Sequence, residues 1–336
     1  MGLNGILITN LKISVTGTVI MMLVLIAFLP LVLGTSSSPP RTTGNIVATI
    51  VVGPEPNEIV YNPSNNKVYV SHTGTGYGSM GNVSVIDAST NRVVATIRLD
   101  SNPGPLLYNP VNHHVYVTSA NGVNVIDETS NKILTTISLN NVGALAYNPS
   151  NHNVYVSGWQ TIWIIDSFTN KVTGQFSGVS GFNLAFDSNK SYLYASDDYA
   201  NTVLVVNTLS GKLIKSVPVC QWCDPSGMAF NPGNGRIYLA NFGMGKVSVV
   251  SDTTNNIVAT IAVGNNPFGA LYDPLNQKVY ISDYTSAMLS KIDPATNTVI
   301  ANLSAGNGPW NIALDTANGL LYITNLGSNT VTAISP

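Results

Sequence analysis

The sequence predicts an all-β protein assembled from one repeated unit of four short strands. Three observations predict it. The residue that ends one strand, aromatic in six copies and leucine in the last, precedes the tyrosine of a Val-Tyr-Val-like strand by eight residues in all seven copies. Further runs of β-branched and aromatic residues alternate with a period of two. Asn, Asp, Gly and Pro, the residue types that turns require, separate these runs.

The strands of each unit can be placed in order. The first ends at Tyr61, Tyr108, Tyr147, Phe186, Phe230, Tyr272 or Leu314. The second contains Tyr69, Tyr116, Tyr155, Tyr194, Tyr238, Tyr280 or Tyr322. The third ends at Asp87, Asp127, Asp166, Asn207, Ser251 or Asp293, and the fourth follows a short turn, as in residues 92–97 (RVVATI). Because successive tyrosines are 39 to 47 residues apart, we predict a seven-bladed β-propeller of four-stranded antiparallel blades over residues 45–336.

The two ends of the repeat array are complementary. Residues 45–53 (NIVATIVVG) nearly repeat residues 256–264 (NIVATIAVG), so the array begins with a fourth strand that has no blade before it. The last unit stops after its third strand. We therefore expect residues 45–52 to pair with the strand from Asn329 to Ile334 and to complete the seventh blade, which removes an open sheet edge.

The residues before the array predict a membrane segment. Residues 13–34 are uncharged and mostly apolar, and Lys12 is the only charged side chain before Arg41. As a helix these 22 residues span about 33 Å, enough to cross a bilayer. The stretch is long for a signal peptide, which favours a retained transmembrane helix. A cleaved signal helix is the alternative.

The position of Lys12 predicts the orientation of the chain. Residues 1–12 form a short cytoplasmic segment, and residues 35–44, rich in Ser, Thr and Pro, form a flexible linker to the array outside the cytoplasm. The predicted location is the cell membrane, with a single pass, or the exterior if the segment is cleaved. Three Asn-x-Ser/Thr acceptor sequences for glycosylation are consistent with export: Asn82, Asn189 and Asn302.

The composition argues against two classes of protein. Only 9% of the 336 residues are charged, against about 25% in an ordinary soluble domain, and the net charge is −2. A disordered chain combines low hydrophobicity with high net charge, whereas the mean hydropathy here is +0.21. A sequence-independent nucleic-acid binder needs clustered Lys and Arg, which this chain lacks. We therefore predict a folded protein with no nucleic-acid partner.

The recurring motifs resemble those of a known family. The Tyr-Asn-Pro, Val-Tyr-Val-Ser/Thr and Val-Ile-Asp-x-x-Thr-Asn elements are similar to the YVTN β-propeller repeat of archaeal surface-layer and related exported proteins. The resemblance covers about residues 45–336. It implies the propeller fold and a surface or periplasmic location. It implies no particular activity, because the shared motifs are the structural frame of the blade.

The recurring residues are interpreted as structural. We expect the strand-end aspartates to cap turn N–H groups rather than bind calcium, and the tyrosines to pack between blades. A proline five residues before the strand-end aromatic should fix the loop entering the first strand. These prolines are Pro56, Pro103, Pro225, Pro267 and Pro309.

The candidate binding surface is the face whose loops differ between copies. These loops join the fourth strand to the next first strand, and the second strand to the third. They contain Tyr77, Trp159, Tyr199, Trp222, Phe242, Phe268, Tyr284 and Trp310. Two interpretations are open. The aromatics are exposed and form a platform for a glycan or a surface-protein partner, or they cover the channel mouth and pack on one another.

An enzymatic alternative places a metal at the channel mouth. Some propellers are metal-dependent lactonases or lyases, and the corresponding inner-strand position carries Glu58, Asn183 and Asn311. One carboxylate with two amides is a thin ligand set for a divalent cation, and neither a zinc triad nor a Ser-His-Asp set is evident. We therefore predict no catalytic residue, metal or cofactor, and favour a non-catalytic binding or scaffold module over an exported hydrolase or lyase.

The two cysteines form a single C-x-x-C motif, Cys220 to Cys223. The motif lacks the second pair that a structural zinc site requires, and it does not begin a helix, which would lower the thiol pKa. In an exported chain we expect a local disulfide that stiffens the loop into the fifth blade, with free thiols as the alternative.

Overall fold

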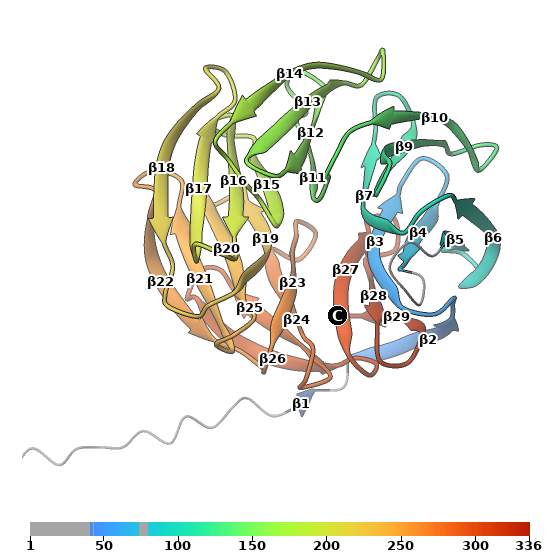
Figure 1. Cartoon of the computed structure of the whole chain (residues 1–336). Coiled ribbons are helices and arrows are strands. Elements are labelled where there is room, and N and C mark those ends of the chain that lie inside the picture. The colour runs from blue at the N-terminus through green and yellow to red at the C-terminus, as the bar shows by residue number, and fades with distance from the viewer. Residues whose placement is uncertain (1–40, 43, 74–79) are drawn as a thin grey trace, which may run out of the picture. The chain divides into compact units, whose positions relative to one another are not determined.

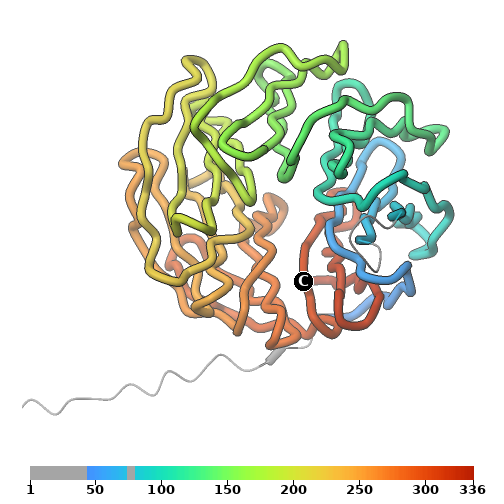
Figure 2. The backbone as a smooth tube through the Cα atoms, viewed as in Figure 1, coloured from blue at the N-terminus to red at the C-terminus, as the bar shows by residue number. Residues whose placement is uncertain are grey.

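The computed structural model describes residues 41–42, 44–73 and 80–336. The predicted transmembrane or signal helix at residues 13–34, the cytoplasmic segment before it and Tyr77 lie outside the described residues. The described part contains no helix long and apolar enough to span a membrane. Its seven antiparallel sheets are arranged as blades around a common axis (Figures 1 and 2), as the repeat predicts.

Each of the first four blades uses four consecutive strands, innermost first. Blade 1 is β3 (Pro56–Asn62), β4 (Lys67–His72), β5 (Gly81–Asp87) and β6 (Arg92–Leu99). Blade 2 is β7 (Pro103–Asn109), β8 (His114–Ser119), β9 (Gly122–Asp127) and β10 (Lys132–Ser138). Blade 3 is β11 (Leu145–Tyr147), β12 (Asn153–Gly158), β13 (Thr161–Asp166) and β14 (Lys171–Ser177). Blade 4 is β15 (Asn183–Asp187), β16 (Tyr192–Asp197), β17 (Thr202–Asn207) and β18 (Lys212–Pro218).

The last three blades follow the same order, except that the seventh takes its outer strand from the N-terminal side of the array. Blade 5 is β19 (Pro225–Asn231), β20 (Arg236–Asn241), β21 (Lys246–Ser251) and β22 (Asn256–Ala262). Blade 6 is β23 (Pro267–Asp273), β24 (Lys278–Asp283), β25 (Met288–Asp293) and β26 (Thr298–Ser304). Blade 7 is β27 (Pro309–Asp315), β28 (Leu320–Asn325), β29 (Thr330–Ser335) and β2 (Asn45–Val51).

The seventh blade joins the two ends of the array. β2 pairs antiparallel with β29, from Asn45 opposite Ser335 to Val51 opposite Thr330. The buried Ile50 packs in one cluster with Val331 of β29 and with side chains of blade 1. This is the pairing that the complementary ends predict.

The structure places a two-residue strand within the predicted linker. β1 (Arg41–Thr42) pairs in parallel with β26, and Arg41 lies opposite Asn302. The outer strand of a blade has unpaired backbone N–H and C=O groups along its edge, and a passing extended segment satisfies them. These two residues of the predicted flexible linker at 35–44 are therefore part of the sheet of blade 6.

The recurring tyrosines and asparagines connect neighbouring blades. Every tyrosine of the second strands is at most 1% exposed, which confirms the predicted packing role. The Tyr322 hydroxyl donates to Asn91 Oδ1 of the next blade at 2.7 Å, and Tyr194 donates to Asn255 in the same way at 3.0 Å. Asn91 has a φ of 54°, a backbone conformation that asparagine adopts more readily than most residues. The Thr-Asn turn thus supplies both a backbone shape and a hydrogen-bond acceptor.

The strand-end aspartates cap turns, as predicted. Asp87 Oδ1 accepts hydrogen bonds from the backbone N–H groups of Ser89 and Thr90, both at 3.1 Å. The hydrogen bond from the Ser89 hydroxyl is the main reason that the pKa of Asp87 is lowered to about 2, and Lys67 contributes to the same shift. The carboxylate is therefore committed to the turn.

The inner strands of blades 3 and 4 differ from the other five. In those five, the recurring proline is the first residue of a seven-residue inner strand. Val142 and Gly181 stand at the corresponding positions of blades 3 and 4, where β11 has only three residues and β15 five. The segments leading into these two strands are therefore loops, and they leave space at one end of the two blades.

Candidate functional site

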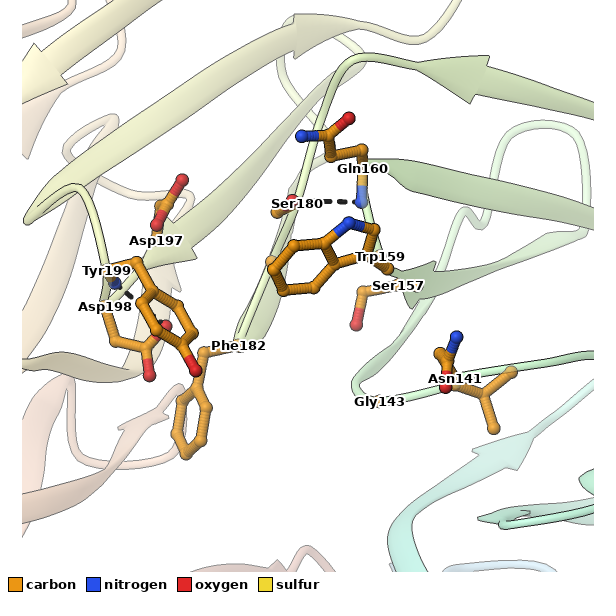
Figure 3. Close-up of a pocket in the computed structure, with 13 residues that line it drawn as sticks. Asn141, Gly143, Ser157, Trp159, Gln160, Ser180, Phe182, Asp197, Asp198 and Tyr199 are labelled. Carbon is orange, nitrogen blue, oxygen red and sulfur yellow. Dashed lines mark hydrogen bonds between the residues drawn. The ribbon is translucent and has the colours of Figure 1, made fainter.

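A pocket of about 500 Å³ lies between blades 3 and 4, on the face whose loops vary (Figure 3). Four segments line it: residues 141–143, 157–160, 180–182 and 197–199. Two of these segments are the loops that replace the start of an inner strand. The pocket therefore occurs where the repeat departs from its own pattern.

Gly181 explains how the second loop fits. A Cβ atom at this position would lie 3.0 Å from the Cβ of Ala195 in β16, which is closer than most real contacts. The loop is tied to the neighbouring turn, because Gln160 N donates to Ser180 Oγ at 3.0 Å. Figure 3 shows this bond beside the Trp159 ring. The loop at Ser180 is thus held by close packing at Gly181 and by a hydrogen bond from a backbone N–H to the serine hydroxyl.

Two exposed aromatic side chains project from turns on either side of the pocket. Trp159, in the turn between β12 and β13, is 68% exposed, and Tyr199, in the turn between β16 and β17, is 85% exposed. Their ring centroids are 6.3 Å apart and their planes are at 79°. The two rings therefore form a corner rather than a flat platform (Figure 3).

Two adjacent carboxylates also line the pocket. Asp197 Oδ1 accepts a hydrogen bond from Ala200 N at 2.9 Å, and Asp198 Oδ1 accepts one from Tyr199 N at 3.1 Å. Among the described residues, neither Oδ2 atom has a hydrogen-bond partner. No described lysine, arginine or histidine lines the pocket. Its charge is therefore negative and without a protein counter-charge.

A second cavity of about 120 Å³ adjoins the first and shares Phe182 and Asp198 with it. Four aromatic side chains line it: Phe182, Phe268 and Trp310 at the starts of the inner strands of blades 4, 6 and 7, and Phe242 in the turn after β20 of blade 5. Phe268 and Trp310 stack with centroids 3.5 Å apart, and Tyr284 meets the edge of Trp310 at 5.5 Å. The small side chain of Ser226 lies among the lining residues and leaves room beside the rings.

The structure divides the aromatic residues singled out by sequence. Tyr284 and Trp310, with Phe242 and Phe268, pack on one another, whereas Trp159 and Tyr199 are exposed at the larger pocket. The four packed residues fit the interpretation of mutual packing, whereas Trp159 and Tyr199 are exposed and their role in binding stays a prediction.

Trp222 belongs to neither cavity. It is 72% exposed in the loop between β18 and β19, where the structure joins Cys220 to Cys223 in a disulfide. The N–H of Cys223 donates to Asn201 Oδ1 at 2.8 Å, and this bond ties the loop to the turn after β16. Trp222 is therefore an exposed tryptophan on a braced loop outside the cavities.

The three inner-strand residues proposed for a metal do not meet as one group. Asn311 Nδ2 donates to Glu58 Oε2, which joins blades 7 and 1. Asn183 Oδ1 instead accepts a bond from Met228 N of blade 5 at 3.3 Å. Protein atoms around Glu58 desolvate its carboxylate and raise its pKa to about 7, although the bond from Asn311 opposes this shift. Within the described ranges, no three His, Cys, Asp or Glu side chains group closely enough to hold a metal ion.

The three glycosylation acceptor sequences have different surroundings. Asn82 is partly exposed in β5, and Asn189 is exposed in a turn where its side chain donates to Pro232 O at 3.0 Å. Asn302 is only 7% exposed in β26, so the folded blade has no room for a glycan on its amide. Asn82 and Asn189 remain the acceptor candidates.

Phe182 and Asp198 are among the pocket residues that the sequence did not single out for binding. The sequence feature that indicates this site is the absence of the recurring proline in blades 3 and 4. The proline found in five copies is absent at Val142 and Gly181, and a lost strand start predicts an open loop at that position.

Comparison with known proteins defines the fold only. No family model matches the chain, and no curated protein matches it. It resembles 1526 chains of solved structures, so the fold does not select a function. One of them is Kuenenia stuttgartiensis hydrazine synthase, which is 17% identical, with a TM-score of 0.75 over 88% of this chain and 97% of that chain. At this identity the likeness supports the β-propeller fold and carries no activity over to this chain.

Proposed function

We propose that the chain is a non-catalytic binding propeller whose ligand occupies the pocket between blades 3 and 4. The carrying observation is the exposed corner of Trp159 and Tyr199 over a pocket of about 500 Å³. Sites for small molecules are typically about 300 to 1,000 Å³ and combine aromatic walls with a few polar groups. The ligand is a small molecule or the terminal unit of a surface glycan or partner.

We also propose that the propeller is exported and tethered to the membrane through residues 13–34, as the YVTN-like repeats and the apolar segment suggest. The disulfide between Cys220 and Cys223 supports this location, because disulfides persist mainly in oxidising compartments. The sparse charge of the sequence suits a surface built from neutral turns.

Replacing Trp159 by Ala should weaken ligand binding by about tenfold without unfolding the ring. The side chain is exposed, so its loss removes contact area for a ligand but little internal packing. Saturation-transfer NMR with soluble mono- and disaccharides and small organic amines measures binding, and the melting temperature reports folding.

Trp222→Ala is the matched control, because this tryptophan has similar exposure but lies outside both cavities. It should leave binding unchanged. A ligand that binds the Trp159→Ala and wild-type proteins equally would place the site elsewhere and overturn the proposal.

A second candidate function is hydrolase or lyase chemistry near Glu58. The specific observation is the raised pKa of about 7, which allows this carboxyl group to exchange a proton near neutral pH. Among the described residues, the polar groups at this site are the Glu58 carboxyl group itself and the Asn311 amide.

Elemental analysis of the purified protein distinguishes the two candidates. We expect no divalent metal at one equivalent per chain, because a Glu58 site has too few oxygen ligands. A stoichiometric ion that is lost on Glu58→Gln would instead show a metal site at Glu58 and favour the enzymatic candidate.

A further inference from the structure

We infer that the ligand of the pocket between blades 3 and 4 is a small organic cation whose ammonium group lies between the Trp159 and Tyr199 rings and the Asp198 carboxylate. The inference rests on the proposed function and names its ligand class. It combines the shape of the aromatic corner, the charge of the pocket and the adjoining cavity.

The charge of the pocket favours a cation. Asp197 and Asp198 each use one oxygen to cap a turn and keep a second oxygen for a partner. Asp224 lines the smaller cavity, and no described basic residue lines either one. A ligand that covers these carboxylates without a counter-charge must pay for their desolvation, whereas an ammonium group compensates it.

The geometry of the aromatic corner also favours a compact cation. A pyranose ring is a chair that stacks through one face of C–H groups on one aromatic face. Trp159 and Tyr199 are at 79°, so a tetrahedral ammonium group contacts both rings at once. Cations are attracted to aromatic faces within about 6 Å of the centroid, most strongly to tryptophan.

The adjoining cavity indicates the rest of the ligand. Phe182 and Asp198 line both spaces, so a molecule with its cation at Asp198 can extend past Phe182. The second space is about 120 Å³ and is lined by Phe268 and Trp310, which suits a small apolar or aryl group. The inferred ligand therefore has an ammonium group at one end and an apolar group at the other.

Binding of matched charged and neutral probes to the full-length protein tests this inference. Choline and its uncharged carbon analogue 3,3-dimethyl-1-butanol have the same shape, and benzyltrimethylammonium adds an aryl group. We expect choline to bind at least about tenfold more tightly than the neutral analogue, and benzyltrimethylammonium more tightly still. Raising the salt concentration should weaken the binding of both cations.

Two variants locate the cation. Asp198→Asn keeps the Oδ1 acceptor for Tyr199 N and removes only the charge, and it should weaken choline binding by about tenfold. Trp159→Ala should weaken it by a similar factor. Asp100→Asn, at an exposed carboxylate outside both cavities, and Trp222→Ala are the matched controls and should leave it unchanged.

The outcomes separate this inference from the proposed function. Equal binding of choline and the neutral analogue overturns the inference. Binding of a neutral disaccharide that Trp159→Ala abolishes, with no binding of the cations, also overturns it and leaves the pocket as a binding site. If no cation, alcohol or sugar binds in a manner that depends on Trp159, the inference and the proposed function both fail.

Discussion

A chain lacking residues 45–53 should melt far below the full-length protein. β2 is the only strand in this segment, and it supplies the outer strand of blade 7 by pairing with β29 from Ser335 to Thr330. Its removal exposes the edge of β29 and the cluster around Ile50, and it removes the strand pairing that links the start of the array to blade 7. Thermal unfolding followed by circular dichroism measures the effect. An unchanged transition would show that β2 does not close the ring.

Point variants in the same strand sharpen this test. Ile50 is 6% exposed and Val51 is 76% exposed, although they are neighbours. Ile50→Ala should lower the free energy of unfolding by about 2 to 4 kcal/mol, because it leaves a cavity between blades 7 and 1. Val51→Ala should change it by less than about 0.5 kcal/mol. Equal effects in urea unfolding would contradict the packing of β2.

Asp283→Asn should stabilise the protein at pH 8. Asp283 ends β24, is fully buried, and accepts a hydrogen bond from Ser290 Oγ at 2.6 Å. Burial raises its pKa to about 7, and the hydrogen bonds to it only partly oppose this shift. Asn241 occupies the same repeat position in blade 5 and donates to Ser248 Oγ at 2.9 Å, so asparagine fits this environment without a charge.

The sign of the pH dependence follows from proton binding. Between the ordinary pKa of 3.8 and the folded value of about 7, the folded state keeps a proton that the unfolded state has released. The contribution of Asp283 to the free energy of unfolding therefore falls as the pH rises through this window. The total loss is at most about 4 kcal/mol, because each pKa unit corresponds to about 1.4 kcal/mol.

Urea unfolding of wild type and variant from pH 4 to pH 8 measures the difference. The advantage of Asp283→Asn should grow across this range, because asparagine does not titrate. Asp197→Asn is the control, since Asp197 holds the same repeat position in blade 4 but is partly exposed. A constant difference between wild type and Asp283→Asn would show that Asp283 does not titrate in this window.

Most of the fold was predictable because the interactions that form a blade are local. The eight-residue spacing between Tyr61 and Tyr69 covers one hairpin, and the same hairpin recurs in every copy. The contact between Glu58 and Asn311 follows from closure, because equivalent positions of blades 1 and 7 become neighbours once β2 pairs with β29. Asn183 shares that position in blade 4 and bonds to blade 5 instead.

The candidate site was only partly predictable, because its residues come from four loops in two blades. The sequence marked Trp159 and Tyr199, but it placed them in one set with Trp310, which packs against Phe268. The exposure of a loop aromatic depends on which side chains of the neighbouring blade contact it. The repeat pattern within one blade does not show those contacts.

By itself, the sequence determined the number of blades and the order of their strands, because both depend on hairpins a few tens of residues long. It also determined how the ring closes, because residues 45–53 repeat the fourth strand of another blade while the last unit lacks one. Only the tertiary structure decided which loop residues form a pocket and which aspartate is buried. Asp197 and Asp283 occupy the same position in their repeats, yet one lines the pocket and the other lies under Gly264 against Ser290. The difference arises from side chains that the fold brings together, and these set the desolvation of each carboxylate.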